Sequence, residues 1–336
     1  MPSVIIAVPT LLGGPTLSSC LQALHRQCFR DFEVIVVNNG AAATGVEAQL
    51  FDFPLRILTP GSNVGFGAAV NLACRDSRAG MIATLNDDTE PDERWLQCLV
   101  AAMEADPQVG MCASRIEIHG TGTLDSSGML VCRDGSSKQR GQSQPGRNWL
   151  EPGEALLPSG CAALYRRELL DDVGLFDEDF FLYCEDTDLG LRALWAGWHC
   201  RYVADAVVQH HYSRTAGAFS PLKAKFVERN RLWVAIKNFP ASWLMLVPFA
   251  SVVRYFWQLS AIRNQRGAAS GFVRSGNSMG NIVTILAAAW WETLVSFPDL
   301  LRKRTRCRQS HRIPRSEFCR TISRHRISLK DLAYSG

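Results

Sequence analysis

Short, mostly apolar runs alternate with helical stretches early in the chain, and this alternation limits the fold more than any other feature. An apolar run of strand length without polar alternation is typical of a strand buried on both faces. Strands that alternate with helices predict an α/β fold with a mostly parallel, Rossmann-like sheet flanked by helices. The runs cover residues 4–9, 32–37, 55–58 and 81–85, and the helical stretches cover about 17–27, 68–75 and 93–105.

Polar residues follow two of these runs directly. Asn38 and Asn39 come after the second run, and Asn86, Asp87 and Asp88 come after the fourth. Ligands of such sheets bind beyond the carboxyl ends of the strands, so these side chains are candidates for a binding site. Adjacent carboxylates there also suit a hard divalent cation that bridges phosphate oxygens. Asn and Asp are common turn formers too, and both interpretations stay open at this point.

A glycine-rich segment, Asn63-Val64-Gly65-Phe66-Gly67, opens the helical stretch at 68–75. Glycines let the backbone approach a ligand closely, and a helix N-terminus favours anions. An ordinary tight turn explains the segment equally well. The spacing is not GxGxxG, so it does not predict a dinucleotide fold.

Residues 176–192, FDEDFFLYCEDTDLGLR, are unusually acidic. The apolar run 180–183 separates two acidic groups, which indicates a buried segment that delivers Glu185 and Asp186 to the mouth of a pocket. Such a carboxylate pair at a helix N-terminus can supply a general base. The alternative is a structural cluster of N-caps and salt bridges, such as Asp188 with Arg192 four residues on. Six carboxylates lie within twelve residues: Asp177, Glu178, Asp179, Glu185, Asp186 and Asp188.

Two adjacent histidines, His210 and His211, follow the apolar run 206–208. A histidine in such a place is often a core residue or a cap. If carboxylates converge on it, its imidazole becomes a good ligand for a transition metal such as Mn²⁺.

Taken in order, the motifs resemble those of family 2 glycosyltransferases of the GT-A fold, particularly the bacterial rhamnosyltransferase-like branch that builds cell-surface glycans. The resemblance spans residues 4 to about 238 and is most specific over 159–198. It rests on VIIAVPT, VIVVNNG, NVGFGAAVNLA, LNDDTEPDERWL, LPSGCAALYRRELLDDVGLFDEDFFLYCEDTDLGLRALWAGW and VVQHHYS.

The resemblance implies an inverting enzyme that moves a sugar, with rhamnose as one candidate, from a nucleotide-sugar donor to a lipid-linked or growing cell-surface glycan. Asp186 would be the catalytic base, with Glu185 its neighbour in the family's ED motif. Asp88 and His210 would bind a divalent cation, Mn²⁺ or Mg²⁺, with His211 as the alternative to His210. The donor would lie beside Pro9, Thr10, Asn38, Asn39, Asn63, Gly65, Asn86 and Asp87.

Two positions depart from the family pattern. Asn38 stands where relatives usually carry an aspartate that helps hold the donor, and Asn86 stands where many carry the first Asp of the DxD-like motif. These departures motivate an alternative function, a catalytically impaired GT-A-like binding or scaffold subunit of a glycan assembly complex. The presence of Asp88, Glu185, Asp186 and His210 argues for the enzyme.

Charge is unevenly distributed in this chain of net charge +4. Residues 301–336 hold eleven Lys and Arg but two acidic residues, a net charge of +9, which leaves −5 for the first 300 residues. Such a tail suggests an anionic partner, and no aromatic-interleaved or zinc motif indicates nucleic acid. The eleven cysteines form no CxxC pair and the N-terminus shows no signal peptide, so we expect free thiols in the cytoplasm.

We expect three parts: a GT-A catalytic domain over 1–238, an apolar helical extension over 239–300 and a basic, flexible tail over 301–336. The apolar stretches 243–262 and 282–297 each contain a charge, Arg254 or Glu292, and carry aromatic residues typical of the membrane–water interface. We therefore expect peripheral docking on the anionic inner face of the cell membrane. A soluble helical cap with a disordered tail is the alternative.

Overall fold

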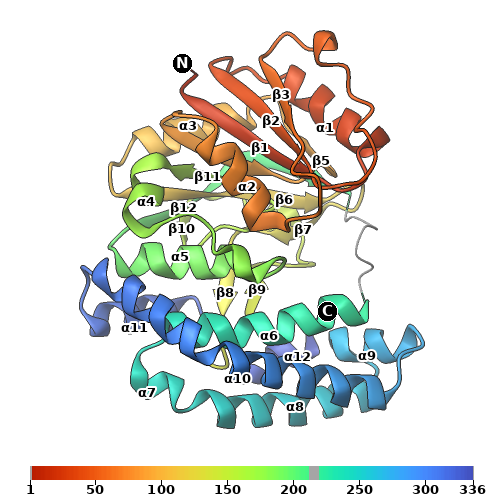
Figure 1. Cartoon of the computed structure of the whole chain (residues 1–336), viewed down its shortest axis with the longest axis vertical. Coiled ribbons are helices and arrows are strands. Elements are labelled where there is room, and N and C mark those ends of the chain that lie inside the picture. The colour runs from red at the N-terminus through yellow and green to blue at the C-terminus, as the bar shows by residue number, and fades with distance from the viewer. Residues whose placement is uncertain (1, 212–218, 336) are drawn as a thin grey trace. The chain divides into compact units, whose positions relative to one another are not determined.

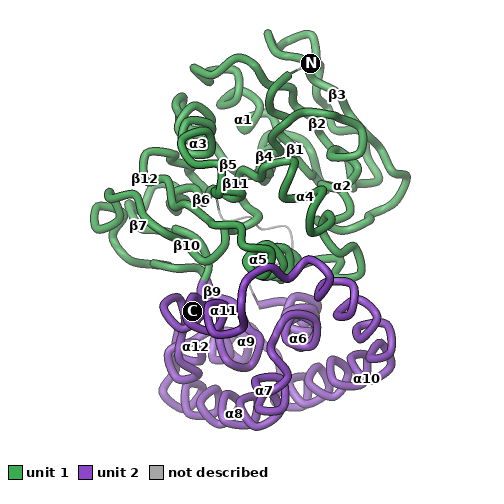
Figure 2. The backbone as a smooth tube through the Cα atoms, turned by 90° about the vertical axis from the view of Figure 1, so that its left-hand side faces the viewer, with its two compact units in different colours: residues 1–129, 139–215 green, residues 130–138, 216–336 purple. Residues whose placement is uncertain are grey.

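The computed structural model describes residues 2–211 and 219–335 (Figure 1). The chain divides into two compact units, each considered by itself below. Unit 1 comprises residues 1–129 and 139–215, and unit 2 comprises residues 130–138 and 216–336 (Figure 2). The helix at 221–238, which we expected in the catalytic domain, thus belongs to unit 2.

Unit 1 is built on a ten-stranded mixed sheet, counted over the described residues. Strand β1 lies between β2 and β4 and is parallel to both, and β3 continues the parallel part beside β2. Strand β11 is antiparallel to both β4 and β6, which makes the other half mixed. The strands are β1 (Val4–Thr10), β2 (Phe32–Asn38), β3 (Leu55–Leu58), β4 (Met81–Leu85), β5 (Thr89–Pro91), β6 (Val109–Ile118), β7 (Thr123–Ser126), β10 (Gly153–Ala155), β11 (Ala162–Arg166) and β12 (His199–His210).

Helices cover both faces of this sheet, so the α/β prediction is confirmed. Successive side chains of a strand point to opposite faces. Accordingly Val4, Ile6 and Val8 of β1 pack into one core with α1 (Gly14–His25) and α3 (Trp95–Glu104). Ile5 and Ala7 pack into a second core with α2 (Phe66–Arg75), α4 (Arg167–Val173) and α5 (Glu185–Trp195). Burial on both faces explains why these strands have uninterrupted apolar sequences.

The parallel strands end together at one edge of the sheet. Thr10, the last residue of β1, lies opposite Asn38, the last residue of β2. Strand β4 pairs with β1 on the other side and ends at Leu85, so Asn86 begins a loop at the same edge. The chain therefore collects its predicted donor-side residues where parallel sheets place their ligands.

Unit 2 is helical throughout its C-terminal part. We expected a flexible tail over residues 301–336. The structure instead has the end of α10 there, followed by the helices α11 and α12. The physical reason is packing: Phe318 and Ile322 are buried, and Arg304 donates to the carbonyls of Ile236 and Phe239 at 2.5 and 2.6 Å. The helices are α6 (Pro221–Asn238), α7 (Ala241–Leu244), α8 (Val247–Arg263), α9 (Gly267–Arg274), α10 (Met279–Gln309), α11 (Arg315–Arg324) and α12 (Leu329–Tyr334).

Among the residues that the structure describes, one helix, α10, is long and apolar enough to cross a membrane. Its most apolar 18 residues have a mean hydropathy of 1.2. The charge within this stretch, Glu292, forms ion pairs with Lys225 at 2.5 Å and Arg229 at 3.5 Å, both on α6. Helix α10 packs along α6, so this side of α10 belongs to the helical bundle.

A hairpin tip from the middle of the chain, formed by β8 (Met129–Val131) and β9 (Ser137–Gln139), contributes residues 130–138 to unit 2. Its Asp134 is fully buried and lies 2.6 Å from the Arg254 guanidinium. Arg231, also fully buried, donates to the Asp134 carbonyl at 2.9 Å and pairs with Glu228. Burial alone would raise the pKa of Glu228, but Arg231 and Arg254 hold it below its ordinary value. Two arginines and two carboxylates therefore share one buried cluster, the Asp134 cluster.

Candidate active site

The acidic stretch folds into a strained segment followed by a helix. Phe181, Tyr183 and Cys184 have φ of 63°, 70° and 69°, the left-handed region, which costs each non-glycine residue on the order of 1 kcal/mol or more. A backbone hydrogen bond holds the segment in place, because Phe66 N–H donates to the Phe181 carbonyl at 2.8 Å. A Cβ at Gly65 would lie 2.2 Å from the same carbonyl oxygen, so that position requires glycine. The strained segment fixes where α5 begins, at Glu185.

Asp186 has a hydrogen-bonded, half-buried carboxylate. Its Oδ2 accepts from Gly160 N–H at 3.0 Å, and its Oδ1 accepts from Thr187 N–H at 2.6 Å. Burial raises the pKa of Asp186, and these hydrogen bonds oppose the rise because they stabilise the charged form. Asp186 is thus prepared to carry negative charge in a site shielded from water.

Glu185 has the opposite environment. Its Oε2 is buried and accepts no hydrogen bond from the described residues. Burial, and then the nearby Asp186 charge, raise the pKa of Glu185. Since like charges at close range are not both favoured, the proton of this pair belongs on Glu185 and the charge on Asp186. The two carboxylates therefore suit different roles, as the family's ED motif implied.

We expect Glu185→Gln to stabilise the fold at alkaline pH. A raised folded-state pKa means that the folded protein binds a proton which the unfolded chain has released, so wild-type stability falls as pH rises above the ordinary carboxyl range. Gln mimics the protonated form and avoids this loss. The free energy of unfolding of the variant should therefore exceed that of wild type by on the order of 1 kcal/mol or more at about pH 8. Urea unfolding at about pH 5 and pH 8 measures it. An equal stability difference at both pH values would contradict the assignment.

The other acidic residues of the stretch are structural. Asp188 pairs with Arg192 at 2.9 Å, both buried, which confirms the predicted i, i+4 pair. Arg192 also donates to the carbonyls of residues 173–175 and so ties α5 to the end of α4. Glu178 pairs with Arg75 at 2.7 Å. The structural interpretation of the acidic stretch therefore applies to Asp188 and Glu178, and the catalytic one stays a prediction for Glu185 and Asp186.

Asp88, His210 and Asp125 form a line of three side chains. His210 Nε2 lies 3.3 Å from Asp88 Oδ2, and His210 Nδ1 lies 2.9 Å from Asp125 Oδ2. His211 points elsewhere, to Glu90 at 2.9 Å, so His210 is the histidine that faces the predicted metal ligand. Sequence reasoning missed Asp125, because an Asp in a stretch rich in glycine and serine resembles a turn former.

These residues fit a divalent cation. Asp88 Oδ2 is buried and accepts no well-formed hydrogen bond within residues 2–211 and 219–335, so it could bind one. A carboxylate that holds the far nitrogen of an imidazole, as Asp125 holds His210, is the usual support of a metal-binding histidine. Within those same residues no cluster of three or more such ligands occurs, so most positions around the ion would go to the phosphates of the donor.

Asp87 points back to β1. Its Oδ2 accepts from the Thr10 hydroxyl at 2.5 Å. Burial raises the pKa of Asp87 to about 6, although the hydrogen bond from Thr10 lowers it. Pro9, next to Thr10, lies opposite Val37 in the β1–β2 ladder. Thr10 and Asp87 are therefore in direct contact, and Pro9 and Asn86 lie at the same sheet edge.

The asparagines are tied to the neighbouring loops. Asn39 Nδ2 donates to the Gly65 carbonyl at 3.1 Å, and Asn63 Oδ1 accepts from Gly65 N–H at 2.9 Å. Asn38 closes its own turn: Nδ2 donates to the Ala42 carbonyl at 2.9 Å, and Oδ1 accepts from Gly40 N–H at 3.0 Å. A carboxylate could not donate to that carbonyl. The departure from the family's aspartate thus has a local structural role.

One short segment connects the two halves of the site. The carbonyl of Cys161 accepts from Asn86 N–H at 2.8 Å, and the neighbouring Gly160 N–H donates to Asp186. Cys161 and Gly160 are adjacent, so the loop that carries Asp87 and Asp88 and the helix start that carries Asp186 are held at a fixed separation. The start of the helix that carries the predicted base and the loop that carries Asp88 are therefore both tied to residues 160–161.

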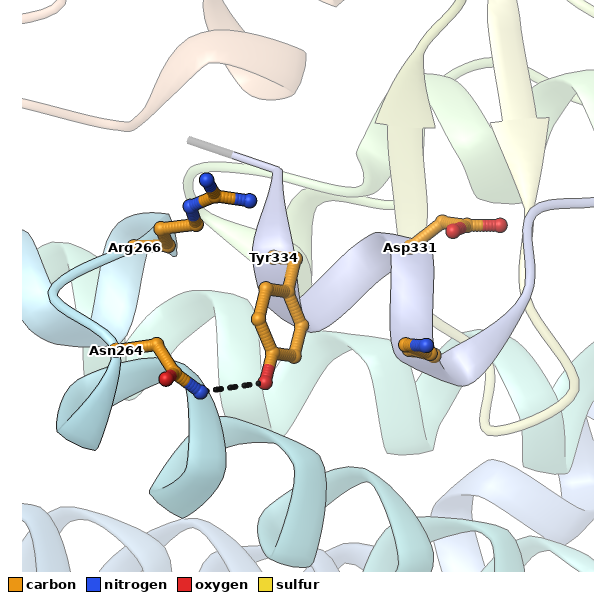
Figure 3. Close-up of a pocket in the computed structure, with 5 residues that line it drawn as sticks. Asn264, Arg266, Asp331 and Tyr334 are labelled. Carbon is orange, nitrogen blue, oxygen red and sulfur yellow. Dashed lines mark hydrogen bonds between the residues drawn. The ribbon is translucent and has the colours of Figure 1, made fainter.

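A surface hollow of about 560 Å³ lies in unit 2 and contains none of the predicted site residues (Figure 3). In Figure 3, the Asn264 amide donates to the Tyr334 hydroxyl, at 3.1 Å. Its cations are Arg266 and Lys330, and Asp331 also lines it. The predicted site residues all lie in unit 1.

Comparison with known proteins agrees with this geometry. The model of the family "Glycosyl transferase family 2" matches residues 5–174. The N-acetylglucosaminyl-diphospho-decaprenol L-rhamnosyltransferase of Mycobacterium tuberculosis is 31% identical over 237 residues, 63% of this chain and 77% of the relative. The O-antigen biosynthesis protein RfbC of Myxococcus xanthus is 28% identical over 65% of this chain, but only 18% of that longer protein is covered.

Solved structures share the fold at low identity. The mannosyltransferase PcManGT of Pyrobaculum calidifontis, in complex with GDP-Man and Mn²⁺, has a TM-score of 0.53 and 18% identity over 92% of this chain and 86% of its own. GalNAc-T7 with UDP, GalNAc and Mn²⁺ has a TM-score of 0.57 and 14% identity, over 70% of this chain and 48% of its own.

Proposed function

Because this chain belongs to glycosyltransferase family 2 and has the GT-A fold, it is a glycosyltransferase, and we propose that it transfers a sugar from a nucleotide-sugar donor to a lipid-linked glycan. The observation that carries this proposal is the link through residues 160–161, which holds Asp186 at a fixed separation from Asp88. The name of the Mycobacterium tuberculosis relative makes rhamnose and a polyprenyl diphosphate-linked sugar the first donor sugar and acceptor to test.

We assign Asp186 as the general base. Its carboxylate removes the proton of the acceptor hydroxyl while that oxygen forms a bond to the anomeric carbon and the bond to the diphosphate breaks. Attack opposite the leaving group in one step inverts the anomeric configuration. The hydrogen bonds from Gly160 and Thr187 keep the carboxylate oriented.

The donor side is assigned to the loops at the carboxyl ends of β1, β2 and β4. Asp88 and His210 would hold a divalent cation, which neutralises the charge that develops on the leaving diphosphate. Asp125 fixes the imidazole of His210 through Nδ1. Thr10 and Asp87 hold the β1 and β4 loops together, and Asn39 and Asn63 shape the loop before α2.

We place the reaction at the cytoplasmic face of the cell membrane. All eleven cysteines are free thiols, which suits a reducing compartment. A lipid-linked acceptor would also be presented at a membrane surface. Transfer of labelled sugar from a panel of nucleoside diphosphate sugars, including a rhamnose donor, to extracted membrane lipids tests the proposal. Product of unchanged anomeric configuration would contradict the single-displacement step.

We expect Asp88→Ala to abolish the Mn²⁺-dependent part of donor binding, because it removes the predicted carboxylate ligand, whose Oδ2 lies 3.3 Å from His210 Nε2. Asp125→Asn should weaken the same part about 10- to 100-fold, since a misoriented imidazole binds metal less well. Calorimetric titration of nucleoside diphosphate sugar with and without Mn²⁺ measures both.

His211→Ala is the matched control, because the His211 side chain bonds to Glu90 rather than to the Asp88 carboxylate. The backbone bond from His211 N–H to the Asp88 carbonyl stays in this variant, so donor binding should be unchanged. Donor binding that is equally strong in excess chelator for all these variants would remove the metal from the proposal.

A further inference from the structure

Helix α8 and the turn before it expose a continuous apolar stripe. Met245, Phe249, Val252, Phe256 and Leu259 follow one another at intervals of four and three residues, which places them on one helix face. Their exposed fractions run from 49% to 81%. The other side of α8 is packed, with Ser251 and Arg254 buried, so the helix is fixed and presents this stripe outward.

Helix α10 presents a second stripe of the same kind. Val283, Trp291, Leu294, Val295 and Leu301 are all exposed, Trp291 at 67%. The opposite side of α10 packs along α6 and buries Ala289, Thr293 and Leu300. A helix that packs against the protein on one side and exposes an apolar surface on the other can bind a second apolar partner through that surface.

The two stripes belong to neighbouring helices. Trp290 Nε1 of α10 donates to the Tyr255 hydroxyl of α8 at 3.1 Å, and both figures show the two helices along the same end of unit 2 (Figures 1 and 2). Large exposed apolar patches are rare on soluble monomers and mark protein or membrane contacts. We call the exposed residues of the two stripes the apolar face.

The charges around the apolar face favour lipid as its partner. Arg263 follows Leu259 by four residues and Arg302 follows Val295 by seven, so each stripe continues into an exposed arginine. Arginines at the edge of an apolar face extend to the headgroups of a bilayer while their stems stay in apolar surroundings. Residues 239–336 hold fifteen Lys and Arg against four acidic residues, so two copies would repel each other whereas anionic lipid would attract.

We propose that the apolar face of α8 and α10 docks this enzyme on an anionic lipid bilayer, with both helices lying in the plane of the interface. The inference goes beyond the proposed transferase activity and does not depend on which sugar is moved. It replaces the flexible tail that we expected with a rigid helical surface, because part of the tail's charge, Arg304, is buried against carbonyls of the 236–239 segment.

Co-sedimentation of the full-length protein with vesicles of phosphatidylcholine and phosphatidylglycerol in equal amounts tests the docking. The variant combines Phe249→Gln, Phe256→Gln and Trp291→Gln, which removes three exposed rings without touching the packed side of either helix. We expect vesicle affinity to fall about tenfold or more, because each ring contributes on the order of 1–3 kcal/mol when buried. Leu50→Gln, equally exposed in unit 1, is the control and should bind as wild type.

Salt and lipid composition separate the charge contribution. Binding should weaken when phosphatidylglycerol is omitted and when ionic strength rises, since exposed charges are screened beyond about 10 Å at 0.1 M salt. Three results would overturn the inference: wild type that ignores anionic vesicles at low salt, a triple variant that binds like wild type, or concentration-dependent dimers that disappear in the triple variant without any vesicle binding. Resistance to alkaline carbonate extraction would show that α10 spans the bilayer instead.

Failure of the docking proposal can be distinguished from failure of the transferase proposal. Donor binding in solution, followed by thermal shift with a nucleoside diphosphate sugar and Mn²⁺, depends on unit 1 and should be unchanged in the triple variant. Vesicle binding without any donor binding would leave the docking surface in place and remove the enzymatic assignment.

Discussion

Replacement of Asp186 by Asn is expected to lower kcat by about 100- to 10,000-fold, the usual effect of losing a general base. Asn keeps the size of the side chain, and its single amide oxygen can still accept from either Gly160 or Thr187. The strained segment also fixes the start of α5, so this helix should remain in place. It cannot take the proton of the acceptor hydroxyl. Donor binding should therefore persist while turnover is lost, and initial-rate measurements with a calorimetric donor titration separate the two.

The control is Asp179→Asn, in the same acidic stretch but exposed and ahead of the strained segment. It should retain turnover within a few-fold of wild type. If Asp186→Asn also kept turnover in that range, the base would have to be another group, and Glu185 would be the next candidate.

Arg231→Met is expected to lower the free energy of unfolding by about 3–5 kcal/mol, because it breaks a buried ion cluster from one side. Methionine fills much of the volume but leaves Asp134 and Glu228 with Arg254 as their one remaining arginine. Two carboxylates and one guanidinium then lie in a site shielded from water. Urea unfolding followed by circular dichroism measures the change.

Arg308→Met is the matched control, since Arg308 is an exposed arginine near the end of α10. A surface substitution of this kind usually changes stability by about 0.5 kcal/mol or less. A combined Arg231→Met, Glu228→Gln variant should recover part of the loss, because it removes one of the uncompensated carboxylates. Equal stability of Arg231→Met and Arg308→Met would mean that the Asp134 cluster contributes no net stability.

The sheet and the family could be predicted from sequence because their signals are local. The uninterrupted apolar runs at β1, β2 and β4 give buried strands directly, and the polar residues after them mark the sheet edge where Thr10, Asn38 and Asp88 lie. The relation of Asp186 to an apolar anchor was also visible, because Phe180 is fully buried before α5 begins.

Long-range pairing was not visible in the same way. Helix α6 is rich in Lys and Arg, but its Glu228 and Arg231 are buried because partners on α8 and on the hairpin neutralise them. The contact of Asp125 with His210 was not predicted, because the two residues are 85 positions apart in sequence and come together only in the folded chain. A sequence shows which residues carry charge, but the pairing of charges depends on the folded chain.

The Asp134 cluster also has a consequence for the order in which the chain is made. Asp134 leaves the ribosome 97 residues before Arg231, its first arginine partner. At about 5–20 residues per second this corresponds to a delay on the order of 5–20 s. During that time the Asp134 carboxylate of the 130–138 hairpin tip has no Arg231 guanidinium to pair with. The 130–138 hairpin tip can therefore be buried with its ion pairs formed only after the C-terminal helices that carry its arginine partners have been made.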